Sequence, residues 1–317
     1  MVEIDTHDAL LLNLTPSLLR LLLVDKTTGG NIYWVTDAYT KLGEEYQPSC
    51  QILPCLITGP MEKIIRPRAL KSHDEQQTRT RNMGEVFTPP IVCCAQNNLL
   101  DTAWFGHENA IFSVDQNSQA WMPVDHEVEF TDNKNWRHYV DKRVLEMACG
   151  EAPYLTSRYN AESGELIPMV MRMGLLDRKL RVVLENTLND DEAWNKWSLR
   201  ALEATYAFDL QGDNVLLARE NLLAAYCEWS RFRNGQWPDA RRVKVAANRI
   251  VWNVFQMDGT TYEVPFAQRR VLDGPNQLPG MESFHQEGVP CLVRDWRAMS
   301  GGSAITFRSL VRGGEDG

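Results

Sequence analysis

The chain has 317 residues, enough for one large domain or two modest ones with a substantial buried core. Its hydrophobic content of 44% and charged content of 24% are ordinary for a globular protein, and no uncharged apolar run reaches the roughly 20 residues that span a bilayer. The formal net charge of −9 argues against a protein that coats DNA by itself, because neutralised phosphates supply most non-specific affinity.

Cysteine usage and the N-terminal segment predict a cytoplasmic protein. The seven cysteines are odd in number and form no Cys-x-x-Cys pair, so we expect neither a disulfide framework nor a zinc cluster. Residues 9–23 are apolar but lack a basic start, which favours a buried helix pair over a signal peptide. The histidines are widely spaced, and we assign no metal ligand.

Residues 1–80 are predicted to form a small N-terminal α+β extension. An apolar helical start is followed by a strand-like run at 32–36. Residues 63–81 are strongly basic, and two interpretations of them stay open. They form either a solvated loop face or a strip that faces phosphates.

Residues 81–265 show alternating strands and helices. In chain order the pattern predicts a helix over 91–104, a strand over 144–148, a helix from about Glu151, a hairpin within 160–170, a helix from Asp190 to about 203, a strand over 204–209, a helix from Gly212, a helix from Pro238 to 248 and a strand over 250–257. Alternation of this kind predicts an α/β fold, a parallel sheet with helices on both faces.

Three acids stand where predicted strands end. Glu146 lies near the end of the first strand, Asp209 ends the second, and Asp258 follows the third. Open parallel sheets bind ligands outside the carboxyl ends of their strands. At such strand ends, one acid can hold a cationic or amide group of a ligand. A second can accept from both ribose hydroxyls, and a third can accept from the exocyclic amine of adenine. Each acid alone is better explained as a helix cap, but their recurrence favours a ligand site.

A turn of small residues follows the first strand. Ala148 and Gly150 leave room for a ligand to approach the backbone and the next helix N-terminus. Cys149 lies between them, and without a supporting histidine it is interpreted as a packed thiol rather than a nucleophile. Upstream, the run Phe87-Thr88-Pro89 sets an aromatic ring and a hydroxyl ahead of two prolines.

Together and in this order, these motifs resemble the N-terminal half of gamma-type DNA adenine-N6 methyltransferases, often labelled restriction endonuclease subunit M. The likeness covers most of residues 60–300 and includes Arg66–Leu70, Gly84–Pro89, Glu146–Leu155, Gly174–Leu180, Gly212–Asn214, Trp252–Gly259 and Arg294–Trp296. The resemblance implies a Rossmann-like methyltransferase sheet that binds S-adenosyl-L-methionine (SAM). By the same resemblance, the cofactor-binding residues are Phe87, Thr88 and Pro89 at the methionine part, Glu146, Ala148 and Gly150 at its amino-acid end, Asp209 at the ribose and Asp258 at the adenine amine.

The chain departs from the family pattern in two ways. A glycine of the family's turn is Ala152 here, which is tolerable if its φ stays below zero. The Asn/Asp-Pro-Pro-Tyr/Phe segment, with which the family grips a flipped adenine, does not occur in the 317 residues. We therefore expect no catalytic residue in this chain. The expected protein is the SAM-binding subunit of a split DNA adenine-N6 methyltransferase from a restriction–modification or phage-defence system, inactive when isolated.

A partner subunit, the product of a neighbouring gene, would supply catalysis and target recognition, and double-stranded DNA would bind through the complex. We expect residues 266–317 to form the partner interface, because a strand at 250–257 left at the sheet edge exposes unpaired backbone groups. Alternatively, the apolar stretches 290–296 and 304–311 fold back over the chain's own edge. Two other functions stay open: a non-catalytic SAM-dependent or DNA-associated interaction protein of a defence system, and a complete small-molecule methyltransferase.

Overall fold

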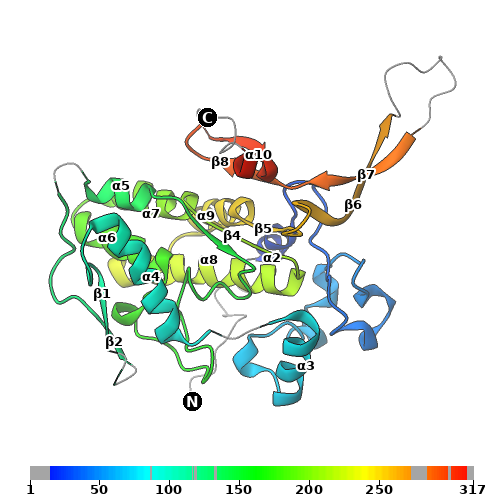
Figure 1. The fold of residues 1–317 in the computed structure, drawn as a ribbon, viewed down its shortest axis with the longest axis horizontal. Helices are drawn as coiled ribbons and strands as arrows, with labels where there is room; N and C mark the ends of the chain where they lie inside the picture. The colour runs from blue at the N-terminus through cyan, green and yellow to red at the C-terminus, as the bar shows by residue number, and fades with distance from the viewer. Residues whose placement is uncertain are drawn as a thin grey trace.

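The structure is a computed structural model that describes residues 15–85, 88–115, 117, 120–131, 134–272, 284–298 and 301–312. It has a mixed α/β architecture with a small parallel sheet (Figure 1). The helices are α2 (Thr15–Leu23), α3 (His73–Met83), α4 (Pro90–Phe105), α5 (Trp136–Asp141), α6 (Leu175–Asn186), α7 (Asp191–Glu203), α8 (Gly212–Asn234), α9 (Ala240–Asn253) and α10 (Phe307–Arg312). The strands are β1 (Phe112–Asp115), β2 (Ala120–Pro123), β3 (Val144–Met147), β4 (Thr205–Asp209), β5 (Val254–Gln256), β6 (Glu263–Leu272), β7 (Phe284–Pro290), β8 (Leu292–Asp295) and β9 (Ser303–Thr306).

Strands β3, β4 and β5 form the parallel sheet, with β4 in the centre. Glu146 on β3 pairs with Ala207 on β4, and Asp209 at the end of β4 pairs with Gln256 on β5. The strands are short and rich in β-branched and aromatic residues, which suit a pleated surface. The prediction of an α/β protein with a parallel sheet is confirmed at this level.

The two faces of the sheet are covered differently. Ala207 and Val254 face a hydrophobic core that they share with helices α6 to α9. Phe208 and Phe255 point to the opposite face, where both rings contact Phe307 at the start of α10. The prediction of helices on both faces is therefore wrong in its detail. The hairpin of β8 and β9 with the short α10 covers the second face instead of crossover helices.

Helix α7 begins where the sequence predicts it. The Asp190 carboxylate accepts a hydrogen bond from the Ala193 N–H at 2.9 Å, which satisfies a backbone donor of the first turn. The boundary between α9 and β5 differs from the prediction. Ile250 and Val251 are buried on α9, which continues to Asn253. Of the expected strand over 250–257, only the second half forms a strand in the structure. The reason is that a short apolar run does not distinguish helix from strand.

The chain does not enter a helix directly after β3. It turns through residues 148–156, and the next helix is α6, so the helix expected from about Glu151 is wrong. Pro153 explains the difference, because the residue before a proline disfavours the helical conformation. The hairpin expected within 160–170 is reduced to one bridge between Tyr159 and Leu166.

The N-terminal extension packs into the core of the sheet. Trp34 is fully buried in the same hydrophobic cluster as Val254, and the expected strand over 32–36 contributes one bridge, between Tyr33 and Gln51. A Cβ atom on Gly212 would lie 2.0 Å from the Tyr33 carbonyl oxygen, so this approach to the start of α8 requires glycine. Of the predicted helix pair at 9–23, residues 9–14 lie outside the described residues.

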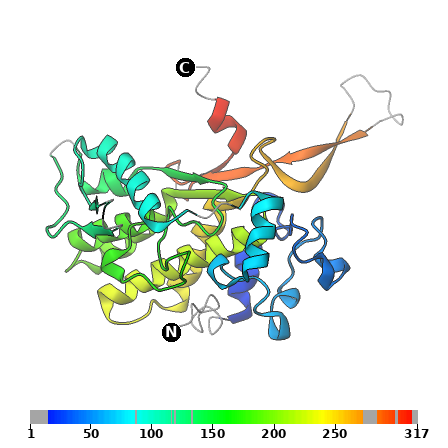
Figure 2. The same ribbon diagram turned by 60° about the horizontal axis from the view of Figure 1, so that its bottom comes forward.

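The C-terminal residues return to the sheet, and one ribbon projects from it. Strands β6 and β7 pair in an antiparallel ribbon that extends away from the body (Figures 1 and 2). Val293 and Phe307 are buried against the chain's own sheet, as in the fold-back alternative for 290–296 and 304–311.

The exposed edge of the sheet is not the edge that the sequence predicts. The outer side of β5 is covered, because the buried Gln256 side chain bonds to both the N–H and the carbonyl of Tyr33, at 2.7 and 2.8 Å. At the opposite edge, no described strand pairs with β3 except β4. On β3, Leu145 and Met147 are 44% and 70% exposed.

All seven cysteines are free thiols. In the described part of the chain, no three His, Cys, Asp or Glu side chains gather as a metal ion would require. None of the described helices combines the length and the apolar character needed to cross a membrane.

Candidate functional site

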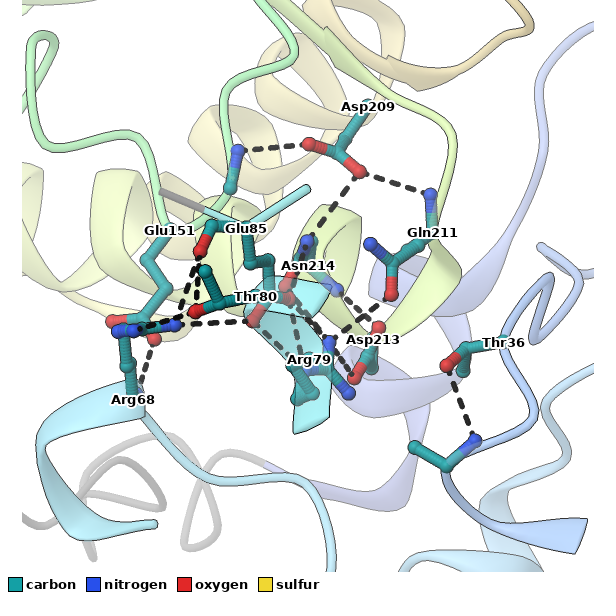
Figure 3. A network of polar contacts seen from close by, with 12 residues as sticks. Thr36, Arg68, Arg79, Thr80, Glu85, Glu151, Asp209, Gln211, Asp213 and Asn214 are labelled. Carbon is teal, nitrogen blue, oxygen red and sulfur yellow. Dashed lines mark hydrogen bonds and ion pairs between the residues drawn. The ribbon is translucent and has the colours of Figure 1, made fainter. Parts of the chain in front are cut away.

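A cavity of about 510 Å³ opens at the carboxyl ends of β3 and β4. Its walls are the turn after β3, the end of β4 with the start of α8, the segment that precedes α4, and the segment around Arg68. Figure 3 shows the polar contacts along one wall, where Arg68, Glu85 and Asp209 come together from distant parts of the sequence. Strand ends of a parallel sheet that border a cavity of this size are a usual position for a small-molecule ligand.

The turn after β3 has an unusual backbone. Ala148, Gly150 and Ala152 have φ angles of +49°, +53° and +62°. Glycine adopts this conformation freely, whereas each alanine is strained by about 1 kcal/mol. The condition under which alanine is tolerable at position 152, a φ below zero, is therefore not met. Strain retained in a turn that lines a cavity is typical of functional sites.

Asp209 ties the end of β4 to this turn. One carboxylate oxygen accepts a hydrogen bond from the Gly150 N–H at 2.8 Å, and the other accepts one from the Gln211 N–H at 2.9 Å (Figure 3). The Asn214 amide lies 3.5 Å from the second oxygen. Burial raises the pKa of Asp209 to about 6. Asp209 therefore lines the cavity as expected and also holds the turn in place.

Glu146 brings an incompletely bonded carboxyl group to the cavity. Its Oε1 accepts a weak hydrogen bond from the Tyr154 N–H at 3.4 Å. Its Oε2 is shielded from solvent and has no hydrogen-bond partner among the residues that the structure describes. Burial raises the pKa of Glu146 to about 8. A buried acid that lacks a partner is costly, so this oxygen is suited to accept from a ligand donor.

The upstream motif lies on the same cavity. Gly84 and Thr88 line it, and Pro90, the first residue of α4, lines it as well. Pro89 is the N-cap residue of α4, next to the wall. Phe87 lies outside the described residues. The structure thus brings together two motifs that the sequence separates by α4, the hairpin of β1 and β2, and α5.

Asp258 is the predicted site residue that the structure does not bring to the cavity. Its Oδ1 accepts hydrogen bonds from the Thr260 N–H at 2.8 Å and the Thr260 hydroxyl at 2.6 Å, closing a local turn. These bonds lower the pKa of Asp258. Met257 still bonds to Asp209 on β4, and the turn toward β6 begins at Asp258, which forms a bridge with Glu263. In this structure Asp258 stabilises its own turn and is not among the residues that line the cavity.

Much of the basic segment 63–81 is neutralised inside the chain. Arg66 forms an ion pair with Glu75 at 2.8 Å. Arg79 is 4% exposed and lies between Asp213, at 2.8 Å, and Glu85, at 2.5 Å (Figure 3). The buried Arg79 belongs to neither of the surfaces considered for the segment, whereas Arg66 stays partly exposed to solvent. The buried one, Arg79, attaches α3 to the start of α8.

Three further residues of the cavity were missed by sequence reasoning. Arg68 lay in the basic segment without a signal of its own, and Glu151 was read as the start of a helix. Glu151 instead accepts hydrogen bonds from the Arg68 N–H and the Tyr159 hydroxyl, both at 2.5 Å. Asn214 had one available signal, since it lies in the first turn of the helix that follows Asp209.

Cys149 lines the cavity but has no features of a nucleophile. Its side chain is 2% exposed, and burial raises the pKa of its thiol well above the ordinary value. The Cys149 Sγ lies 3.6 Å from the Gly150 carbonyl oxygen. The interpretation as a packed thiol agrees with this environment.

Comparisons with models of known protein families, with curated proteins and with solved structures each found no match to this chain.

Proposed function

We propose that this chain binds SAM in the cavity at the ends of β3 and β4. The observation that carries the proposal is the convergence of the 84–90 and 146–152 motifs on one cavity together with Asp209. The buried Glu146 Oε2, which lacks a described partner, fits a ligand with a cationic amine. Asp209 fits a ligand with hydroxyl groups. Bound SAM would supply a methyl group on a positively charged sulfur.

The order of the sheet supports a Rossmann-like methyltransferase domain as part of the proposal. Strands β3, β4 and β5 are parallel and adjacent in sequence order, and α8 follows β4 directly. Glu146 and Asp209 stand at neighbouring strand ends, where such folds bind nucleotide-like ligands. The proposal of a Rossmann-like methyltransferase domain rests on this strand order and on the motif resemblance.

We further propose that the chain is the SAM-binding subunit of a split DNA adenine-N6 methyltransferase of a restriction–modification or phage-defence system. The 317 residues contain no Asn/Asp-Pro-Pro-Tyr/Phe segment, so the proposal assigns base recognition and catalysis to a partner chain. In such a complex this chain would position SAM, and the partner would carry most contacts to double-stranded DNA.

Two surfaces are proposed to receive the partner. At the outer edge of β3 no strand pairs within the described part of the chain, and Leu145 and Met147 are exposed beside it. A parallel strand added there would end at the cavity. The ribbon of β6 and β7, within the expected interface 266–317, projects from the body (Figure 2). A two-stranded ribbon gains stability when another chain packs against it.

Titration calorimetry tests the first proposal. SAM added to the pure chain, with and without the neighbouring-gene product, should give saturable heat with one site per chain. Asp209→Ala should weaken binding by about 1–3 kcal/mol, because it removes a polar contact and releases the Gly150 turn. Absence of binding in both states would refute the proposal, and an unchanged dissociation constant would remove Asp209 from the site.

Methyl transfer tests the second proposal. Tritiated methyl groups should enter adenine of mixed-sequence DNA only when both chains are present. Incorporation by the pure chain at high concentration would show instead that catalysis needs no partner.

A further inference from the structure

Arg68 presents a positive charge to the cavity from a fixed position. Its backbone N–H donates to Glu151 Oε1 at 2.5 Å, its Nη2 donates to the Thr80 hydroxyl at 3.1 Å, and its Nη1 lies 3.4 Å from the Glu85 carbonyl oxygen (Figure 3). The side chain is 19% exposed. The contacts to Thr80 and to the Glu85 carbonyl hold the guanidinium at the wall, and the contact to Glu151 fixes the backbone of the same residue. A planar fork of N–H groups in this position suits a carboxylate.

The charge of Arg68 is weakly compensated. Its ion pair with Glu85 is long, 3.7 Å between Nη1 and Glu85 Oε2. Both oxygens of Glu85 already accept from Arg79 Nε at 2.9 Å, and one also accepts from Arg79 Nη2 at 2.5 Å. Arg158, the other arginine on the cavity, is instead bound by Glu228, with contacts at 2.7, 3.1 and 3.2 Å. Arg68 is thus better placed than Arg158 to accept a new anionic partner.

The cavity therefore offers two complementary groups to one ligand: the Glu146 carboxyl, whose Oε2 has no described hydrogen-bond partner, and a weakly compensated cation, Arg68. A ligand that carries both a free amine and a free carboxylate offers a partner to each group. We propose that Arg68 binds the carboxylate of the amino-acid end of SAM while Glu146 accepts from its ammonium group. This inference rests on the proposed function and deepens it by naming the residue that selects the carboxylate.

A ligand pair isolates this contact without any mutation. Decarboxylated SAM keeps the adenosine, the sulfonium and the amine but lacks the carboxylate. The wild-type chain should bind SAM roughly 10- to 100-fold more tightly than decarboxylated SAM, the range expected for one charge-assisted bidentate contact. Equal affinity for the two ligands would overturn the inference.

Variants then assign the preference to Arg68. Arg68→Gln should weaken SAM binding roughly 10- to 100-fold and leave decarboxylated SAM binding within a few-fold, so that the preference disappears. Arg68→Lys, which keeps the charge but loses the fork, should keep part of the preference and serves if the glutamine variant fails to fold. Arg66→Gln is the matched control, because Arg66 lies on the same segment but pairs with Glu75, and it should bind both ligands as wild type does.

The outcomes separate this inference from the proposed function. If Arg68→Gln weakens both ligands equally, the residue only supports the fold of the wall, and the inference falls while SAM binding stands. If the wild-type chain binds SAM and decarboxylated SAM equally and Arg68→Gln changes neither, Arg68 faces another anion such as a DNA phosphate, and the inference also falls. If the wild-type chain binds neither ligand, the proposed function fails and the inference with it.

Discussion

At the scale of single residues, the turn after β3 combines strain with a clear role. Ala148 and Ala152 hold left-handed conformations that glycine adopts freely, at φ of +49° and +62°. The turn lines the cavity and is tied to Asp209 through Gly150. The strain is therefore located where the backbone must approach a ligand, which is where folded proteins commonly retain it.

The strain predicts opposite effects of exchanging glycine and alanine in this turn. Ala152→Gly should raise the free energy of unfolding by about 0.5–1 kcal/mol, because relief of the left-handed strain exceeds the entropy that glycine adds to the unfolded chain. Gly150→Ala should lower it by about 1 kcal/mol through strain alone, since a Cβ there would meet no atom within 4 Å. Urea denaturation of both variants measures this. Destabilisation by Ala152→Gly would contradict the account.

Glu146 predicts a dependence of stability on pH. Burial raises its folded pKa to about 8, whereas an unfolded glutamate titrates near pH 4.3. Between these values the folded chain binds more protons than the unfolded chain, so the contribution of Glu146 to stability falls as the pH rises. Glu146→Gln should flatten this decline and stabilise the chain at pH 8 by about 1–3 kcal/mol.

Thermal unfolding of wild type and Glu146→Gln at pH 5, 6.5 and 8 provides the measurement. A stability difference that does not grow with pH would show that Glu146 is solvated or paired. SAM should then suppress the wild-type decline, because a cationic partner for Glu146 favours its charged form.

The sequence could predict Glu146 and Asp209 because each lies at or one residue before a strand end, and the strand ends were identifiable. Asp258 lies two residues beyond β5, and this distance is enough for the chain to turn and for the side chain to bond to Thr260. The place of Arg68 on the cavity could not be predicted, since it depends on hydrogen bonds that Arg68 donates to Glu151 and Thr80, which no local pattern encodes.

At the scale of elements, α3 is attached to the site through one buried arginine. Arg79 bonds to Asp213, which is fully buried and also accepts from the Tyr39 hydroxyl at 2.8 Å. Arg79→Met should lower the free energy of unfolding by about 3 kcal/mol or more, because Asp213 would keep a buried charge without its cation. Melting curves provide the measurement.

Arg66→Met is the matched control for Arg79→Met. Arg66 and Glu75 are both partly exposed, at 37% and 48% of their side-chain area. Arg66→Met should lower the free energy of unfolding by less than about 1 kcal/mol, as for other exposed ion pairs. Equal losses in the two variants would mean that the buried network does not stabilise the attachment of α3.

The edge of β3 predicts a separation of folding from assembly. Met147→Lys places a charge on a side chain that is 70% exposed, so thermal stability should change by less than about 0.5 kcal/mol. Recovery of the partner in co-purification should fall strongly, since a lysine on an edge strand opposes strand addition. Full recovery would exclude this edge as the docking surface.

The differences between expected and observed elements have local physical causes. The run after residue 249 is apolar enough for either a helix or a strand, and the spacing of Val243, Ala246 and Ile250 on one face of α9 decides for the helix. Pro153 prevents the helix that was expected from Glu151. Isolated glycines and prolines indicate turns and helix ends in the sequence, whereas no local pattern indicates how distant segments pack together.

At the scale of the whole molecule, the chain covers one sheet face with helices and the other with its own C-terminal strands. The fold-back of Val293 and Phe307 could not be predicted, because apolar alternation is the same for an internal contact and for a partner interface. The α/β class was predictable from alternation alone. The exposed β3 edge was not, since strand order depends on contacts between distant residues.

The central claim is that SAM binds at the carboxyl ends of β3 and β4. Hydrogen–deuterium exchange of the full chain, with and without saturating SAM, tests its location most directly. We expect slower exchange in residues 146–161 and 209–214 and around Arg68, with little change in the ribbon of β6 and β7. Protection elsewhere in the chain, or no protection in these segments at saturation, would contradict it.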